Sequence, residues 1–150
     1  MLAAAVVRSA DGRSVHGVAV SDSVQAIVDA GCDVAVDLTG AAAARANVPL
    51  LAAAGVHVVV GTTGLADDDL AAWRSSFTRS NCLVAANFAI SAVLMMRFAE
   101  MAAPWFDTAE IIELHHDQKI DAPSGTAVAT ARRMAAASSE SAADPTQHEV

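Results

Sequence analysis

Short apolar runs alternate with helical patterns along most of the chain. The apolar runs are rich in valine and lack regular polar alternation, which is typical of parallel strands covered on both faces. They span residues 15–20, 33–38, 56–60 and 82–86. Each is followed by a stretch with helical spacing of its apolar residues, so the pattern predicts alternating strands and helices.

Start and stop signals divide these helical stretches. Pro49 lies inside the second of them and is expected to kink or shorten it, because proline cannot donate the backbone hydrogen bond. The order strand, helix, strand, helix, strand, helix, strand predicts an α/β fold with a doubly wound parallel, Rossmann-like sheet. Helices are expected from Asp22 or Ser23 to Gly31, across residues 40–54 before Gly55, and from Asp67 through Trp73.

The pattern changes near Pro104. Residues 88–103 are expected to form one long helix, and residues 108–115 a strand that opens a different, α+β region. We therefore expect two domains, 1–104 and 105–150, both incomplete, with the sheet of the first lacking its N-terminal part. The segment 138–145 is polar and rich in breakers, which predicts a polar C-terminal tail.

Charge and cysteine content narrow the class of protein. Lys and Arg number 9 against 17 Asp and Glu, for a net charge of -8, which disfavours binding to nucleic acid and to anionic membranes. No apolar run reaches the ~20 residues that span a bilayer. Cys32 and Cys82 lack the spacing of a metal or redox motif, so they are expected to be reduced thiols in a cytoplasmic protein.

A first candidate site follows the predicted strands. Gly61-Thr62-Thr63-Gly64 comes directly after the strand at 56–60, at the carboxyl end where open α/β sheets bind ligands. An ordinary strand-to-helix turn would use the same glycines. The ends of two other strands, residues 37–39 and 85–88, are expected to flank the same crevice, which favours a ligand site.

A second candidate site contains the only lysine, Lys119, beside His115 and His116. Strand alternation would place Glu113 and His115 on one face and His116 on the other, so one strand cannot aim both rings at one metal, and no metal site is expected. A hydrogen-bonded structural histidine is the plainer interpretation. Lys119, four residues after His115, is instead expected to form a proton-donating pair with a histidine.

The turn Pro123-Ser124-Gly125-Thr126 precedes a helical run at 127–137. Ser124 or Thr126 can cap that helix, which is the commoner use of such a sequence. Helix starts also present backbone N–H groups and a favourable dipole to anions such as carboxylates. The two interpretations are compatible.

The residues from Glu113 to Lys119, followed by Asp121-Ala122-Pro123-Ser124-Gly125-Thr126-Ala127, closely resemble the signature of the dihydrodipicolinate reductase (4-hydroxy-tetrahydrodipicolinate reductase) family of lysine and diaminopimelate biosynthesis. The motifs at 61–64, 87–90 and 97–100 also have the order and spacing of that family. This resemblance covers roughly residues 33–133. It implies a partial dinucleotide-binding domain followed by a partial substrate-binding and catalytic domain.

The resemblance also implies an activity and its residues: an oxidoreductase that uses NADPH or NADH to reduce 4-hydroxy-tetrahydrodipicolinate, a dicarboxylate, to tetrahydrodipicolinate. The family's complete architecture further implies a homotetramer. By position, His115 and Lys119 match the catalytic acid/base and proton donor. Substrate contacts match His116, Gly125 and Thr126, and cofactor contacts match Gly61, Thr62, Thr63, Ala85, Ala86, Asn87 and Phe88.

Two alternatives stay open at this stage. The family's G-x-x-G-x-x-G pyrophosphate loop does not occur among the eight glycines, so a truncated, inactive member that retains only a carboxylate-binding turn is one alternative. A hydrolase or metal enzyme with a similar α/β frame is the other, although the placement of His115 and His116 on one strand argues against it.

Overall fold

The computed structural model describes residues 1–117 and 122–138, which form two compact units, Met1–Ala85 and a second that begins at Ala86. This division comes earlier than the domain boundary expected at residue 104, which stays a prediction. The strands are β1 Ala5–Val6, β2 Ser14–Val15, β3 Val18–Ser21, β4 Val34–Asp37, β5 His57–Val60 and β6 Cys82–Val84. The helices are α1 Gln25–Asp29, α2 Ala41–Ala54, α3 Asp67–Ser76, α4 Ile90–Ala102, the 3-10 helix η1 Ala103–Trp105, and α5 Gly125–Ala137.

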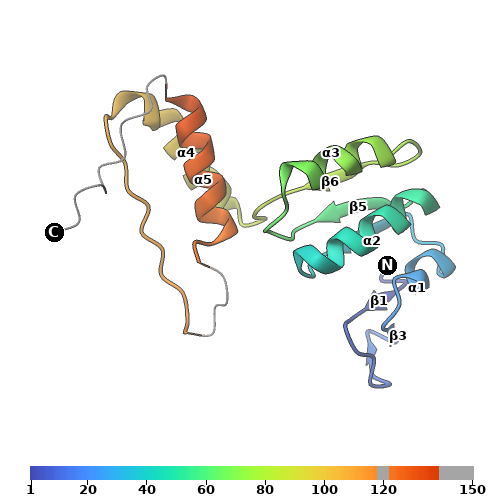
Figure 1. Ribbon diagram of the computed structural model, residues 1–150. Coiled ribbons are helices and arrows are strands. Elements are labelled where there is room, and N and C mark those ends of the chain that lie inside the picture. The colour runs from blue at the N-terminus through green and yellow to red at the C-terminus, as the bar shows by residue number, and fades with distance from the viewer. Residues whose placement is uncertain (118–121, 139–150) are drawn as a thin grey trace. The chain divides into compact units, whose positions relative to one another are not determined.

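The first unit contains a parallel sheet in the order β4-β5-β6, with α2 and α3 as the connecting helices (Figure 1). Val36 of β4 pairs with Val59 of β5, which in turn pairs with Leu83 of β6. The three predicted parallel strands are therefore confirmed as neighbours. The predicted α/β fold with a parallel sheet is also confirmed.

The core of this unit lies on one face of that sheet. Inward side chains of β4 and β5 pack against α2 and α3, in a cluster that consists of Ala35, Ala44, Val48, Leu51, Val56, Val58, Val60 and Trp73. On the other face Val34, Val36 and Leu83 are 54%, 61% and 58% exposed. Within residues 1–85, therefore, α2 and α3 cover the core face of this sheet, and the expected cover of the other face is not provided by this unit.

Residues 15–20 do not form one strand, as the apolar run predicted. β2 and β3 instead pair antiparallel around a two-residue turn, with φ 49° at His16 and 79° at Gly17. A two-residue hairpin turn of type I′ requires positive φ at both of its central residues, and its twist matches that of the flanking strands. β3 also pairs parallel with β1, in a small sheet of order β1-β3-β2.

The helix signals were largely informative. Gly55 ends α2 in the left-handed conformation with φ 79°, as predicted. α2 continues through Pro49, so the expected shortening is wrong. The N-cap of α1 is Val24 rather than Asp22 or Ser23, although the hydroxyl of Ser23 accepts a hydrogen bond from the amide of Gln25 at 3.3 Å. The N-cap of α3 is Ala66 rather than Asp67.

In the second unit α4 packs beside α5 (Figure 1). Met96 of α4 and Thr130 of α5 are buried, and Arg133 of α5 lies 3.6 Å from the carboxylate of Glu100 on α4. The strand expected at 108–115 is wrong: residues 108–116 have no regular secondary structure. A strand requires a hydrogen-bonding neighbour, and the described residues offer this segment none.

Candidate functional site

A buried carboxylate organises the carboxyl ends of β4 and β5. Asp37, the last residue of β4, is 6% exposed. Its Oδ1 accepts hydrogen bonds from the amide and hydroxyl of Thr39, at 2.9 and 2.6 Å, and lies 3.5 Å from the hydroxyl of Thr62. Its Oδ2 accepts from Nδ2 of Asn47 on α2 at 3.1 Å. Asp37 thereby fixes the polar groups that follow two adjacent strands.

The Gly61–Gly64 loop follows β5 and is held at both ends. The amide of Gly61 donates to the carbonyl oxygen of Asp37 at 2.9 Å, and the carbonyl oxygen of Gly64 accepts from Nη2 of Arg45 at 3.3 Å. Gly64 has φ 79°, and a Cβ there would lie 3.7 Å from the Cβ of Ala41. The loop therefore lies against the first residue of α2.

An ion pair between α2 and α3 holds the far end of this loop. Arg45 binds Asp69 through two hydrogen bonds, Nε to Oδ1 at 2.9 Å and Nη2 to Oδ2 at 2.8 Å. The same carboxylate accepts from the amide of Ala66 at 2.8 Å. The Arg45 side chain, and then the Ala66 amide, hold the pKa of Asp69 below its usual value because both stabilise the charged form.

The second unit forms the predicted capped turn. Ser124, which is buried, is the N-cap of α5 and accepts from the amide of Ala127 through Oγ at 3.1 Å. This confirms Ser124, rather than Thr126, as the cap. Gly125 and Thr126 occupy the first turn of α5, where helices present backbone N–H groups toward anions.

Asn87 connects the beginnings of two helices. Its Oδ1 accepts from the amide of Ala89 at 2.8 Å, beside the start of α4. Its Nδ2 donates to the hydroxyl of Thr126 in α5 at 3.3 Å. The structure thus brings a predicted cofactor contact, Asn87, against a predicted substrate contact, Thr126.

Glu113 lies beside the same turn. Its Oε1 accepts from the amide of Ser124 at 2.7 Å, and its Oε2 lies 3.8 Å from Nδ1 of His115. His115 and His116 are both exposed. Lys119 lies outside the described residues, so its predicted pairing with a histidine stays a prediction.

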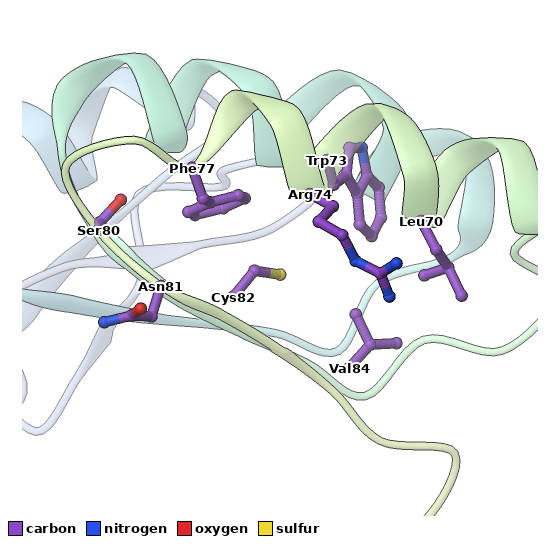
Figure 2. Close-up of a pocket in the computed structure, with 8 residues that line it drawn as sticks. All are labelled: Leu70, Trp73, Arg74, Phe77, Ser80, Asn81, Cys82 and Val84. Atoms are coloured by element: carbon purple, nitrogen blue, oxygen red, sulfur yellow. The ribbon is translucent and has the colours of Figure 1, made fainter.

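Two hollows stand out among the described residues. One, of about 260 Å³ in the second unit, includes Glu113 and Pro123 in its wall, together with Ile111, Ala127, Val128, Ala131 and Arg132. The other, of about 430 Å³, lies between α3 and β6, where Arg74 extends toward Val84 (Figure 2). No predicted site residue lines the larger hollow, which is bounded by Leu70, Trp73, Arg74, Phe77, Ser80, Asn81, Cys82 and Val84.

The predicted residues divide between the two units. Gly61, Thr62, Thr63 and Ala85 belong to the first, and the stretch from Ala86 to Phe88 belongs to the second with the histidines and the turn. The described ranges, 1–117 and 122–138, hold no group of three metal-ligating side chains and no helix long and apolar enough to cross a membrane.

Sequence reasoning did not find the roles of Asn47, Arg45 and Asp69. Three consecutive aspartates, 67–69, at a helix start were an available signal that one of them satisfies a backbone amide. The contacts of Arg45 and Asn47, in contrast, depend on the tertiary fold.

The parallel sheet and the glycine-containing loop at its carboxyl edge define the first unit as Rossmann-like α/β. The chain matches the model of the dihydrodipicolinate reductase N-terminus over residues 2–88 and that of the dihydrodipicolinate reductase C-terminus over residues 91–150. The chain therefore belongs to the dihydrodipicolinate reductase family.

Individual relatives agree with this assignment. The 4-hydroxy-tetrahydrodipicolinate reductase of Streptomyces avermitilis is 44% identical over 127 residues, which are 83% of this chain and 51% of the relative. That of Beutenbergia cavernae is 49% identical over 146 residues, 95% of this chain and 59% of the relative. The dipicolinate-bound dihydrodipicolinate reductase from Paenisporosarcina sp. TG-14 superposes with a TM-score of 0.68 at 40% identity, over 91% of this chain and 53% of that one. The chain spans about half the length of these relatives.

Proposed function

We propose that the chain carries part of the machinery of an NAD(P)H-dependent reductase that converts 4-hydroxy-tetrahydrodipicolinate to tetrahydrodipicolinate. The observation that carries this proposal is the family match over both units, combined with a capped turn suited to a carboxylate at the start of α5. Two free thiols and the biosynthetic relatives support a cytoplasmic location. The homotetramer implied by the family stays part of the proposal.

The strand-end residues fit the nicotinamide side of a dinucleotide. Thr62 is buried with its hydroxyl beside Asp37, and the loop that contains it is fixed against α2. Such a rigid polar edge is the usual ligand position in open α/β sheets. Gly61, Thr62, Thr63 and residues 85–88 would hold the cofactor, which supplies a hydride when bound.

The second unit would hold the substrate and deliver a proton. Gly125 and Thr126, in the first turn of α5, would bind a substrate carboxylate, since the helix start favours negative charge. His116 would contact the substrate. Hydride addition leaves a group that requires a proton, which Lys119 would donate and His115 would exchange as acid/base.

Turnover of the purified chain tests the activity. We expect consumption of reduced nicotinamide that depends on 4-hydroxy-tetrahydrodipicolinate. No turnover, with dipicolinate still bound at Gly125 and Thr126, would favour the alternative of an inactive, carboxylate-binding member. That alternative has a specific basis, since the capped turn is complete within the second unit.

Lys119→Arg tests the proton donor in the active form. Arginine keeps the charge but holds its proton too tightly to donate it near neutral pH. We expect kcat to fall by ~10²–10⁴-fold with little change in substrate affinity, the range typical of general acid catalysis. His115→Gln should cause a comparable loss. A normal kcat with a raised KM in Lys119→Arg would instead make Lys119 a carboxylate anchor.

A further inference from the structure

One carboxylate contacts both halves of the proposed substrate site. Glu113 Oε1 accepts from the backbone amide of Ser124, and Glu113 Oε2 faces Nδ1 of His115. The side chain of Glu113 is 25% exposed, and that of His115 is 39% exposed. The carboxylate is thus shielded more than the ring, as expected for a group that holds others in place.

The contact with Ser124 acts on the carboxylate-binding turn. At 2.7 Å it is a short hydrogen bond to a charged acceptor, the stronger class of such bonds. Ser124 is also the N-cap of α5, so its backbone fixes the direction in which the helix begins. Holding the Ser124 amide therefore orients Gly125 and Thr126, which follow it directly.

The contact with His115 acts on the proposed acid. A carboxylate opposite Nδ1 favours the neutral ring form with its proton on Nδ1, because the alternative would place a lone pair against negative charge. Nε2 is then the nitrogen left to exchange a proton with another molecule. An acidic residue orients the histidine of hydrolytic triads in this way.

We infer that Glu113 is a positioning residue that sets the protonated nitrogen of His115 and the orientation of the turn at Ser124 together. This inference rests on the proposed function, in which His115 exchanges a proton and the turn binds a carboxylate. It assigns Glu113 no contact with substrate. Its effect is to keep the acid and the carboxylate-binding turn in fixed relation to one another.

Nitrogen-15 NMR of the histidine rings in the whole chain tests the first part. In the wild type, neutral His115 should carry its proton on Nδ1. In Glu113→Gln the amide oxygen can still accept from Ser124, while the amide NH₂ faces Nδ1 as a donor. The His115 proton should then move to Nε2, with the Ser124 amide still protected from hydrogen exchange.

Two further variants test the contact with Ser124 and control for the loss of a carboxylate. Glu113→Ala should lose both effects, with fast exchange at Ser124 and dipicolinate binding weakened about tenfold, as for a lost charge-assisted hydrogen bond. Glu110→Gln is the matched control, because it removes an exposed carboxylate from the same extended segment. It should match the wild type in ring protonation, exchange and binding.

The outcomes separate this inference from the proposed function. A proton on Nε2 of His115 in the wild type, or an unchanged ring in Glu113→Gln, would overturn the positioning role even if dipicolinate binds. Absence of dipicolinate binding by the wild type, with the ring still responding to Glu113→Gln, would count against the proposed substrate site while leaving the local effect of Glu113 established.

Discussion

Asp37→Ala should destabilise the first unit more than any surface carboxylate change. The substitution removes the acceptor of bonds from Thr39 and Asn47 at 2.6, 2.9 and 3.1 Å, and the neighbour of the Thr62 hydroxyl. Thr39 is exposed, so water can replace its bonds at small cost. Buried Thr62 and half-buried Asn47 lose an acceptor that water replaces less readily, at a cost of up to about 1–3 kcal/mol for each such group. Their sum predicts a loss of roughly 2–4 kcal/mol, since neighbouring effects are not fully additive.

Urea unfolding followed by tryptophan fluorescence measures this loss. Trp73 is 4% exposed in the core of the first unit, whereas Trp105 in the second unit is 83% exposed, so the change in emission on unfolding reports mainly the first unit. With a urea slope of about 1–3 kcal/mol/M, the midpoint should fall by about 0.7–4 M. Asp37→Asn keeps the shape and one acceptor, and should lose about half as much.

Asp33→Ala is the matched control, because Asp33 is exposed just before the same strand. It should change the free energy of unfolding by less than about 0.5 kcal/mol. If Asp37→Ala and Asp33→Ala shift the urea midpoint equally, the buried network does not contribute to stability, and the reasoning from its distances is refuted.

Two further predictions follow from shifted pKa values. The lowered pKa of Asp69 means that the stabilising contribution of its charged form is complete above the ordinary carboxyl pKa and is lost as pH falls through the lowered one. Hydrogen exchange at the Ala66 amide should therefore accelerate in acid relative to the intrinsic rate, and Asp69→Ala, which removes the acceptor, should show fast exchange already at neutral pH. Burial raises the pKa of the Cys82 thiol, so iodoacetamide should alkylate Cys82 more slowly in the folded chain than in urea, as measured by mass spectrometry, and equal rates would contradict the burial argument.

The sequence was sufficient to predict the elements that are determined by residues close together in the chain. Valine runs without polar alternation located β4, β5 and β6, and Ser124 before a helical run located the cap of α5. The strand predicted at 108–115 did not form because a strand depends on a partner elsewhere in the chain. Alternation of polar and apolar residues shows only that a segment can pair with another strand. The turn at His16 and Gly17 lies inside an apolar run. The hydrophobicity of that run is the same whether it forms one strand or two, so it does not indicate the turn.

In the candidate site, too, the sequence predicted features set by neighbouring residues but not contacts between distant ones. The Gly61–Gly64 loop and the turn at Ser124 were predicted from their neighbours in the chain, and Asp37 from its place at a strand end. The bond between Arg45 and Asp69 joins residues 24 positions apart, and no periodicity encodes which acid an arginine will meet. Lys119 stays a prediction, since it lies outside the described residues.

The anchoring of the segment between β5 and α3 has a consequence for how it can evolve. Its residues 61, 64 and 66 are bound respectively to the Asp37 carbonyl, the Arg45 guanidinium and the Asp69 carboxylate. An inserted or deleted residue would pull at least one of these groups from its partner. These three anchors bind backbone groups at residues 61, 64 and 66, so they do not depend on which side chain stands at residue 63. Across descendants of this sequence, the length of the segment should therefore be more constrained than the chemistry of that side chain.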